Sequence, residues 1–140
     1  NISEAAFMTG MPYPGENASN ECIKDLLLSL AKLGSKKIVI TGVESADHKF
    51  GFMGYDSETK EFFEYYTPKV QMKSHGTGDV FASTFTGALM NDYNIQDSLK
   101  IAADFTKACI NNTYNDPEAV NYAVNFESEI PYLLKLIRKV

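Results

Sequence analysis

The residues most able to do chemistry stand together in His75-Gly76-Thr77-Gly78-Asp79. Two glycines let the backbone turn tightly and approach a ligand closely. The apolar run that follows predicts a helix, so the amides of residues 77–79 would lie at its N-terminus without intrahelical acceptors. Such amides bind phosphate, with help from the helix dipole. Beside them, Asp79 could accept the proton of a substrate hydroxyl that attacks phosphorus.

The same four residues also fit a plainer interpretation, in which the glycines form a loop and Asp79 only caps a helix. A short glycine-rich string has a considerable rate of chance matches. Its surroundings favour the phosphate interpretation, because a buried helix follows and an apolar strand ending in Ile40-Thr41-Gly42-Val43 lies upstream.

Hydrophobic spacing predicts the elements that position this motif. We expect helices over residues 2–10, 20–33, 76–90 and 128–139, and another that begins after Asn94 and presents Ile95, Leu99, Ala102, Thr106 and Cys109 on one face. The helix over 76–90 is apolar or small on every side, which is typical of a helix buried all round. Residues 49–56 and 61–67 should form a β-hairpin. The β-branched run in 36–43 suggests a buried strand of a parallel sheet.

These elements make an α/β protein, and a length of 140 residues favours a single domain over residues 1–140. Few strands are visible for helices of this apolarity, so we expect more strands from a part outside this sequence. The chain opens at Asn1 without methionine or signal peptide, which also suggests a fragment.

Charge and composition exclude two classes of function. A net charge of −5 argues against electrostatic binding of nucleic acid over a broad surface. It is compatible with binding of a small polyanion such as a nucleotide. No apolar run reaches the roughly 18 residues that a membrane span needs. The two cysteines, Cys22 and Cys109, fall in apolar helical patterns and are expected to be buried, reduced thiols of a cytoplasmic protein.

Several motifs resemble one family of enzymes. Gly76-Thr77-Gly78-Asp79 with the following Val80-Phe81-Ala82-Ser83 resembles the signature of ribokinase-superfamily small-molecule kinases. Asn1-Ile2-Ser3-Glu4 resembles the family's Asn-x-x-Glu motif, and Ile40-Thr41-Gly42-Val43 resembles the strand end beside the ATP phosphates. Over essentially all 140 residues the sequence resembles the C-terminal half of a pyridoxal (vitamin B6) kinase. The resemblance implies a ribokinase-like three-layer α/β/α fold, of which this chain would be the C-terminal portion with few strands and a β-hairpin.

The resemblance also implies residue roles. Asp79 would be the general base, and the amides of Gly76, Thr77 and Gly78 would form the anion hole for the transferring phosphoryl group. Asn1 and Glu4 would organise Mg²⁺, partly through water. In the nucleotide site, Thr41 and Gly42 would contact the phosphate side of ATP, and Val70 would contact the adenine.

The implied activity is ATP-dependent phosphorylation of the hydroxymethyl group of pyridoxal, pyridoxine or pyridoxamine, with Mg²⁺ as cofactor. The implied partners are a B6 vitamer and ATP, with no nucleic acid and no membrane, and a homodimer in the complete protein. Two alternatives stay open: a hydroxymethylpyrimidine kinase of the same superfamily, and a non-catalytic nucleotide-binding fragment. Apolar surface that faces the absent half would be exposed, so we expect the isolated chain to be oligomeric or poorly stable.

Overall fold

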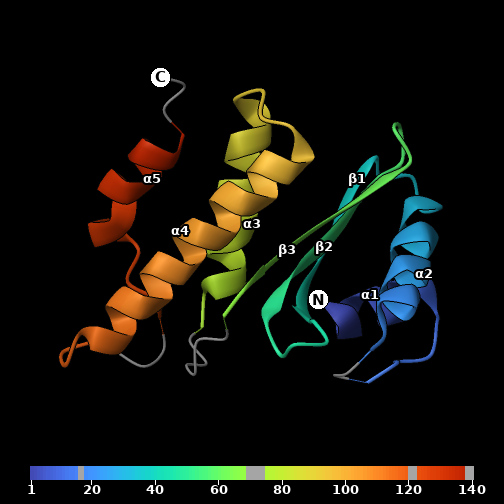
Figure 1. Cartoon of the computed structure of the whole chain (residues 1–140), viewed down its shortest axis with the longest axis horizontal. Coiled ribbons are helices and arrows are strands. Elements are labelled where there is room, and N and C mark those ends of the chain that lie inside the picture. Colours follow the sequence, from blue (N-terminus) through green and yellow to red (C-terminus); the bar gives the residue numbers. More distant parts are fainter. Residues whose placement is uncertain (16–17, 69–74, 120–122, 138–140) are drawn as a thin grey trace. The chain divides into compact units, whose positions relative to one another are not determined.

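The computed structural model describes residues 1–15, 18–68, 75–119 and 123–137. Its elements follow the order α1 (Ile2–Thr9), α2 (Asn20–Ala31), β1 (Lys37–Glu44), β2 (Phe50–Asp56), β3 (Glu61–Thr67), α3 (Thr77–Met90), α4 (Ile95–Asn115), the 3₁₀ helix η1 (Glu127–Glu129) and α5 (Ile130–Leu136), as drawn in Figure 1. The α/β composition is as expected. The chain divides into two compact units, Asn1–Lys69 and Val70–Val140, and each is described by itself. The prediction that they form one domain stays a prediction.

The first unit contains a three-stranded antiparallel sheet in the order β1-β2-β3. Lys37 lies opposite Asp56, and Phe50 lies opposite Thr67. The predicted hairpin is confirmed. The prediction of parallel pairing for the strand at 36–43 is wrong in the described sheet, because β1 pairs with β2 antiparallel. The connection between them spans only residues 45–49, whereas a parallel neighbour needs a crossover of a dozen or more residues.

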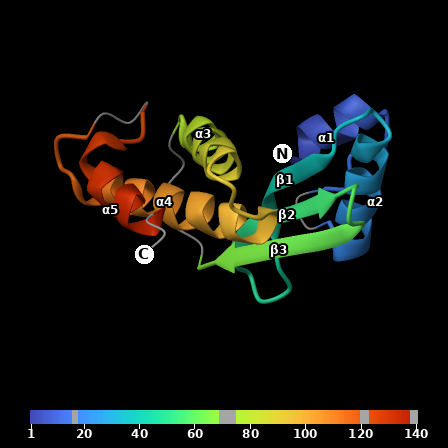
Figure 2. The same ribbon diagram turned by 90° about the horizontal axis from the view of Figure 1, so that it is seen from above.

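The core of the first unit lies between the sheet and the two N-terminal helices (Figure 2). Every second cross-strand pair of β1 and β2 faces this core, including Ile38 opposite Tyr55 and Ile40 opposite Met53. The buried members are Ile2, Ala5 and Ala6 of α1, Ile23, Leu26, Leu27 and Leu30 of α2, and Ile38, Ile40, Val43, Met53 and Tyr55 of the sheet. Helix α2 has Ser19 as its N-cap, a position at which serine is a preferred residue type, and the helix ends two residues earlier than predicted.

The second unit is helical. Asn94 caps α4 as predicted, its side chain accepting a hydrogen bond from the Asp97 amide at 2.8 Å. The predicted face of α4 is buried along its whole length. The last predicted helix is present but shorter, with Pro131 in its first turn.

Two burial predictions are wrong. Helix α3 buries only Phe81 and Ala88, and its last residue, Met90, is 80% exposed. Within its unit α3 packs against α4, and one neighbouring helix covers a single stripe of a helix surface. Cys22 is exposed on α2, whereas Cys109 is buried as expected. The positions on α2 that pack inward are Ile23, Leu26, Leu27 and Leu30, which leaves Cys22 outside that stripe.

Candidate functional site

Helix α3 begins in a turn that glycine makes possible. Gly76 is its N-cap with a φ of 83°, a left-handed conformation that side chains disfavour. Its carbonyl accepts the first helical hydrogen bond, from the Val80 amide at 3.0 Å. The amides of Thr77, Gly78 and Asp79 therefore precede the first residue with an intrahelical acceptor. Gly76 supplies no side-chain cap, and no described residue caps this helix with a side chain.

The turn at the start of α3 is packed against the protein on one side and exposed to solvent on the other. Val80 packs against a buried cluster that includes Phe105, Cys109 and Val124. The Val124 amide donates to the His75 carbonyl at 3.1 Å, which fixes the residue just before the turn. By contrast, Gly78 and Asp79 are exposed, and a Cβ placed on Gly78 would meet no heavy atom within 4 Å. The arrangement offers backbone donors to an anionic ligand and places one carboxylate beside them.

Asn1 and Glu4 are brought together at the start of α1. The Asn1 side-chain oxygen accepts from the Glu4 amide at 3.0 Å, and the Glu4 carboxylate accepts from the backbone nitrogen of Asn1 at 2.8 Å. This reciprocal pattern is a capping box. Both side chains offer hard oxygen donors, the kind that Mg²⁺ prefers.

Thr41 and Gly42 form a bulge in β1. The register with β2 shifts between Thr41 and Val43, and Gly42 has a φ of 72°. A positive φ at a bulge favours glycine, which explains the residue type at this position without reference to a ligand. Thr41 is half-buried and Gly42 is exposed, so both are open to a ligand from solvent.

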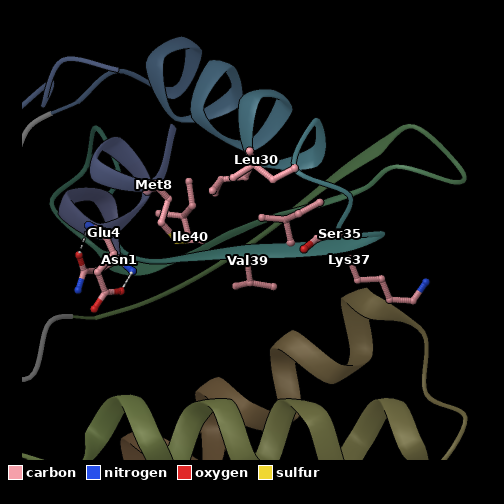
Figure 3. A pocket seen from close by; sticks show the side chains of 11 residues that line it. Asn1, Glu4, Met8, Leu30, Ser35, Lys37, Val39 and Ile40 are labelled. Atoms are coloured by element: carbon pink, nitrogen blue, oxygen red, sulfur yellow. Dashed lines mark hydrogen bonds and ion pairs between the residues drawn. The ribbon is translucent and has the colours of Figure 1, made fainter. Parts of the chain in front are cut away.

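A groove of about 220 Å³ runs beside β1 in the first unit, as Figure 3 shows. Asn1 and Glu4 lie near the Ile40 end of the groove, and Ser35 and Lys37 lie toward the other. Its walls come from α1, the end of α2 and the strand, and consist of Asn1, Glu4, Ala5, Met8, Leu30, Leu33, Ser35, Lys37, Ile38, Val39 and Ile40.

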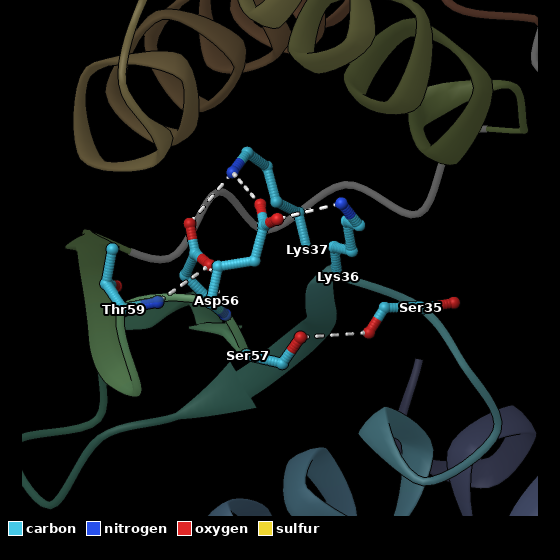
Figure 4. A network of polar contacts seen from close by, with 7 residues as sticks. Ser35, Lys36, Lys37, Asp56, Ser57 and Thr59 are labelled. Carbon is cyan, nitrogen blue, oxygen red and sulfur yellow. Dashed lines mark hydrogen bonds and ion pairs between the residues drawn. The ribbon is translucent and has the colours of Figure 1, made fainter.

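A polar network that the sequence did not reveal joins the start of β1, at Lys37, to the end of β2, at Asp56 (Figure 4). The buried Asp56 carboxylate accepts from Lys37 Nζ at 2.8 Å and from the Glu58 amide at 2.9 Å. The hydrogen bond from Lys37 is the largest of the effects that lower the pKa of Asp56. An aspartate that opens a hairpin loop is a turn signal, but its lysine partner lies 19 residues away and depends on strand register. The network fixes the β1–β2 register.

The sequence-predicted site residues thus form three local groups. Residues 76–79 share the start of α3, Asn1 contacts Glu4, and Thr41 adjoins Gly42. The first group belongs to one unit and the other two belong to the other unit. Val70 lies outside the described residues. Among the described residues, no three His, Cys, Asp or Glu side chains cluster in a way that could hold a metal ion, and no helix is long and apolar enough to cross a membrane.

Solved structures with the same fold are small-molecule kinases. The chain matches a protein from Bacteroides thetaiotaomicron assigned to the phosphomethylpyrimidine kinases, at 25% identity and a TM-score of 0.86, over 100% of this chain and 47% of that one. A second crystal form of that protein, with pyridoxal, matches at 24% identity and a TM-score of 0.84, over 100% and 48%. Pyridoxal kinase from Lactobacillus plantarum matches at 24% identity and a TM-score of 0.81, over 97% and 48%.

The fold is therefore that of the ribokinase-like small-molecule kinases, and the chain spans about half the length of these relatives. No curated protein matches the sequence. Within that class, the model of the phosphomethylpyrimidine kinase family matches residues 1–124, and the chain belongs to this family.

Proposed function

We propose that the protein transfers the γ-phosphoryl group of ATP to the hydroxymethyl group of a small aromatic heterocycle. The observation that carries this proposal is the start of α3, where a glycine turn places helix-start amides that have no intrahelical acceptor beside the exposed carboxylate of Asp79. Phosphoryl transfer is catalysed mainly by positioning and by stabilising negative charge, and such a helix start supplies both. Membership of the phosphomethylpyrimidine kinase family supports a small-molecule kinase.

In this proposal Asp79 is the general base. Its carboxylate accepts the proton of the substrate hydroxyl as the oxygen attacks phosphorus, and the bond to the ADP leaving group breaks. The amides of Gly76, Thr77 and Gly78 stabilise the charge on the transferring group. The left-handed turn at Gly76 sets the position of these donors at the start of α3.

Asn1 and Glu4 are proposed to help hold Mg²⁺, partly through water. Their oxygen donors fit the ion chemically, and their capping box already places the two side chains side by side. Magnesium bound with ATP would neutralise charge on the β- and γ-phosphate oxygens. Thr41 and Gly42 are proposed to contact the phosphate side of ATP, and Val70 the adenine. The complete protein is proposed to be a homodimer.

Two substrates fit the proposal equally well. The family model favours a hydroxymethylpyrimidine, and the solved relative with pyridoxal favours a B6 vitamer. Both are flat heterocycles that carry a primary hydroxyl, so Asp79 could activate either one. The ratio of kcat/KM for pyridoxal and for hydroxymethylpyrimidine, measured with the same preparation, separates them.

The decisive test is Asp79→Asn, which keeps the size of the side chain and removes its basicity. We expect turnover to fall by about 10²–10⁴-fold while the Kd for Mg-ATP stays the same. Asp92→Asn is the matched control, since Asp92 is an exposed aspartate just beyond the other end of α3. Near-normal turnover by Asp79→Asn would refute the proposed base. Binding of Mg-ATP by a folded wild type that turns over neither substrate would favour the non-catalytic alternative.

A further inference from the structure

Two backbone amides hold Val124 between helix α4 and the turn that precedes α3. The Val124 amide donates to the His75 carbonyl at 3.1 Å, and the Asn125 amide donates to the Thr113 hydroxyl oxygen at 2.9 Å. These two amides lie on either side of the Val124 Cα, so both hydrogen bonds restrain the same residue. Thr113 belongs to α4, and His75 directly precedes Gly76. A side chain of α4 is therefore joined to the start of α3 through a single residue.

The Thr113 hydroxyl is oriented to accept the hydrogen bond from Asn125. Thr113 is 1% exposed, and its own hydroxyl donates to the Cys109 carbonyl, one helical turn earlier, at 2.8 Å. A hydroxyl has one proton and two lone pairs, so with the proton directed at Cys109 the oxygen is left to accept from Asn125. Two other buried hydroxyls of α4, those of Ser98 and Thr106, have no hydrogen-bond partner among the described residues. Thr113 therefore differs from these two in what its hydroxyl holds.

The Val124 side chain lies against the turn itself. It is 6% exposed and belongs to the buried cluster against which Val80 packs. A Cβ placed on Gly76 would lie 3.9 Å from Val124 Cγ1, which puts this side chain beside the left-handed residue. Gly76 supplies no side-chain cap, so the positions of the helix-start amides depend on the backbone of the turn. A displacement of Val124 would therefore displace the amides of residues 77–79.

We propose that Thr113 is a positioning residue for the phosphate-binding turn, and that it acts through the Asn125 and Val124 amides. This inference rests on the proposed function, in which the amides of residues 76–78 stabilise the transferring phosphoryl group. Such stabilisation needs donors that are in place before the reaction, and a small misplacement can lower turnover by up to about 10²-fold. Because Thr113 is buried, it contacts no substrate and acts only by holding Val124 in place.

The test removes the Thr113 hydroxyl and keeps the shape of the side chain. Thr113→Val leaves the Asn125 amide without its acceptor. Thr106→Val is the matched control, because it makes the same change at a buried threonine of α4 whose hydroxyl has no described partner. We expect Thr113→Val to speed hydrogen exchange about tenfold at the Asn125 and Val124 amides. With pyridoxal and Mg-ATP, kcat should also fall about tenfold and KM should change little, because the loosened turn still binds ATP but no longer holds its donors in place.

Two further variants separate positioning from general stability. Thr113→Ser keeps the hydroxyl and should restore both the exchange rates and kcat. Thr113→Ala also removes the hydroxyl, without the methyl group that valine would turn toward Asn125, and should lower kcat as Thr113→Val does.

The outcomes distinguish this inference from the proposed function on which it rests. An active Thr113→Val with unchanged kcat, or with unchanged exchange at Val124, would overturn the inference and leave the proposed function standing. An equal loss of kcat in Thr106→Val would overturn it too, since any loosening of α4 would then suffice. Unprotected Val124 and Asn125 amides in the wild type would overturn it without any variant. A wild type that phosphorylates neither pyridoxal nor hydroxymethylpyrimidine would refute the proposed function, and this inference with it.

Discussion

A methyl group added at Gly78 separates phosphate binding from folding. The Cβ position of this glycine meets no heavy atom within 4 Å, so Gly78→Ala is accommodated without a clash. In a helix each Cα–Cβ bond tilts toward the N-terminus, and the new methyl therefore projects to the side where the amides of residues 77–79 would meet a phosphate. Gly87→Ala is the matched control, because it adds the same methyl near the other end of α3 and also meets nothing within 4 Å.

We expect Gly78→Ala to leave the stability of the protein undiminished and to weaken its binding of Mg-ATP. Alanine inside a helix is more favourable than glycine by about 0.8–1.0 kcal/mol, so Gly87→Ala should raise the free energy of unfolding by up to this amount. Gly78 lies in the first turn of α3, where we expect a smaller gain of the same sign. Loss of one hydrogen bond to a charged group costs about 1.5–3 kcal/mol, which corresponds to a rise of about 10- to 150-fold in the Kd for Mg-ATP.

Calorimetric titration of Mg-ATP and urea unfolding, performed on the wild type and both variants, measure the two quantities. We expect Gly78→Ala to bind weakly at undiminished stability, and Gly87→Ala to bind as the wild type does. Equal affinity in the two alanine variants would refute the assignment of the α3 start as the phosphate site. Weak binding by a destabilised Gly78→Ala would also refute it, since the loss would then reflect a damaged helix.

Two other predictions concern stability and reactivity. Asp56→Ala should lower the free energy of unfolding by about 1.5–3 kcal/mol at pH 7, because the buried carboxylate loses Lys37, whereas Lys36→Ala at an exposed ion pair should cause no measurable change. The pKa of Asp56 is lowered in the folded state. The stabilisation from this carboxylate is therefore complete above its unfolded pKa of about 3.9, and it is lost as the pH falls through the folded pKa. Urea unfolding at pH 7 and at pH 3 measures this loss. Iodoacetamide at pH 8, followed by mass spectrometry, should modify Cys22 quickly and leave Cys109 intact, since burial raises the pKa of Cys109 to about 11; equal rates would contradict the packing of α4.

Local patterns predicted the elements that depend on neighbours in sequence. The cap at Asn94, the buried face of α4 and the hairpin of β2 and β3 all follow from spacings of a few residues. The same holds for the start of α3 at Gly76. The capping box of Asn1 and Glu4 spans only three residues as well, but the sequence indicated this pair only through the family resemblance. The amino-acid sequence is therefore sufficient to locate these parts of the candidate site.

Features that depend on distant partners could not be located in this way. The apolarity of α3 indicated complete burial, but a helix buries only the surface that its neighbours reach, and α4 reaches one side of it. The direction of β1 was misjudged because β-branched composition is similar in buried parallel and antiparallel strands. The partnership of Lys37 with Asp56 depends on strand register, which no local pattern specifies.

The sequence by itself suggested the class of chemistry that we propose, because glycines, amides and an aspartate at a helix start suit phosphoryl transfer wherever that helix lies. Tertiary structure alone decided which surfaces are accessible: the exposed Gly78 and Asp79, the open edge of β1 and the groove beside it. The physical reason is the separation along the sequence of the residues that determine each feature. Helix caps and turns depend on residues three or four positions apart, whereas burial and strand pairing depend on contacts between segments that only the folded chain brings together.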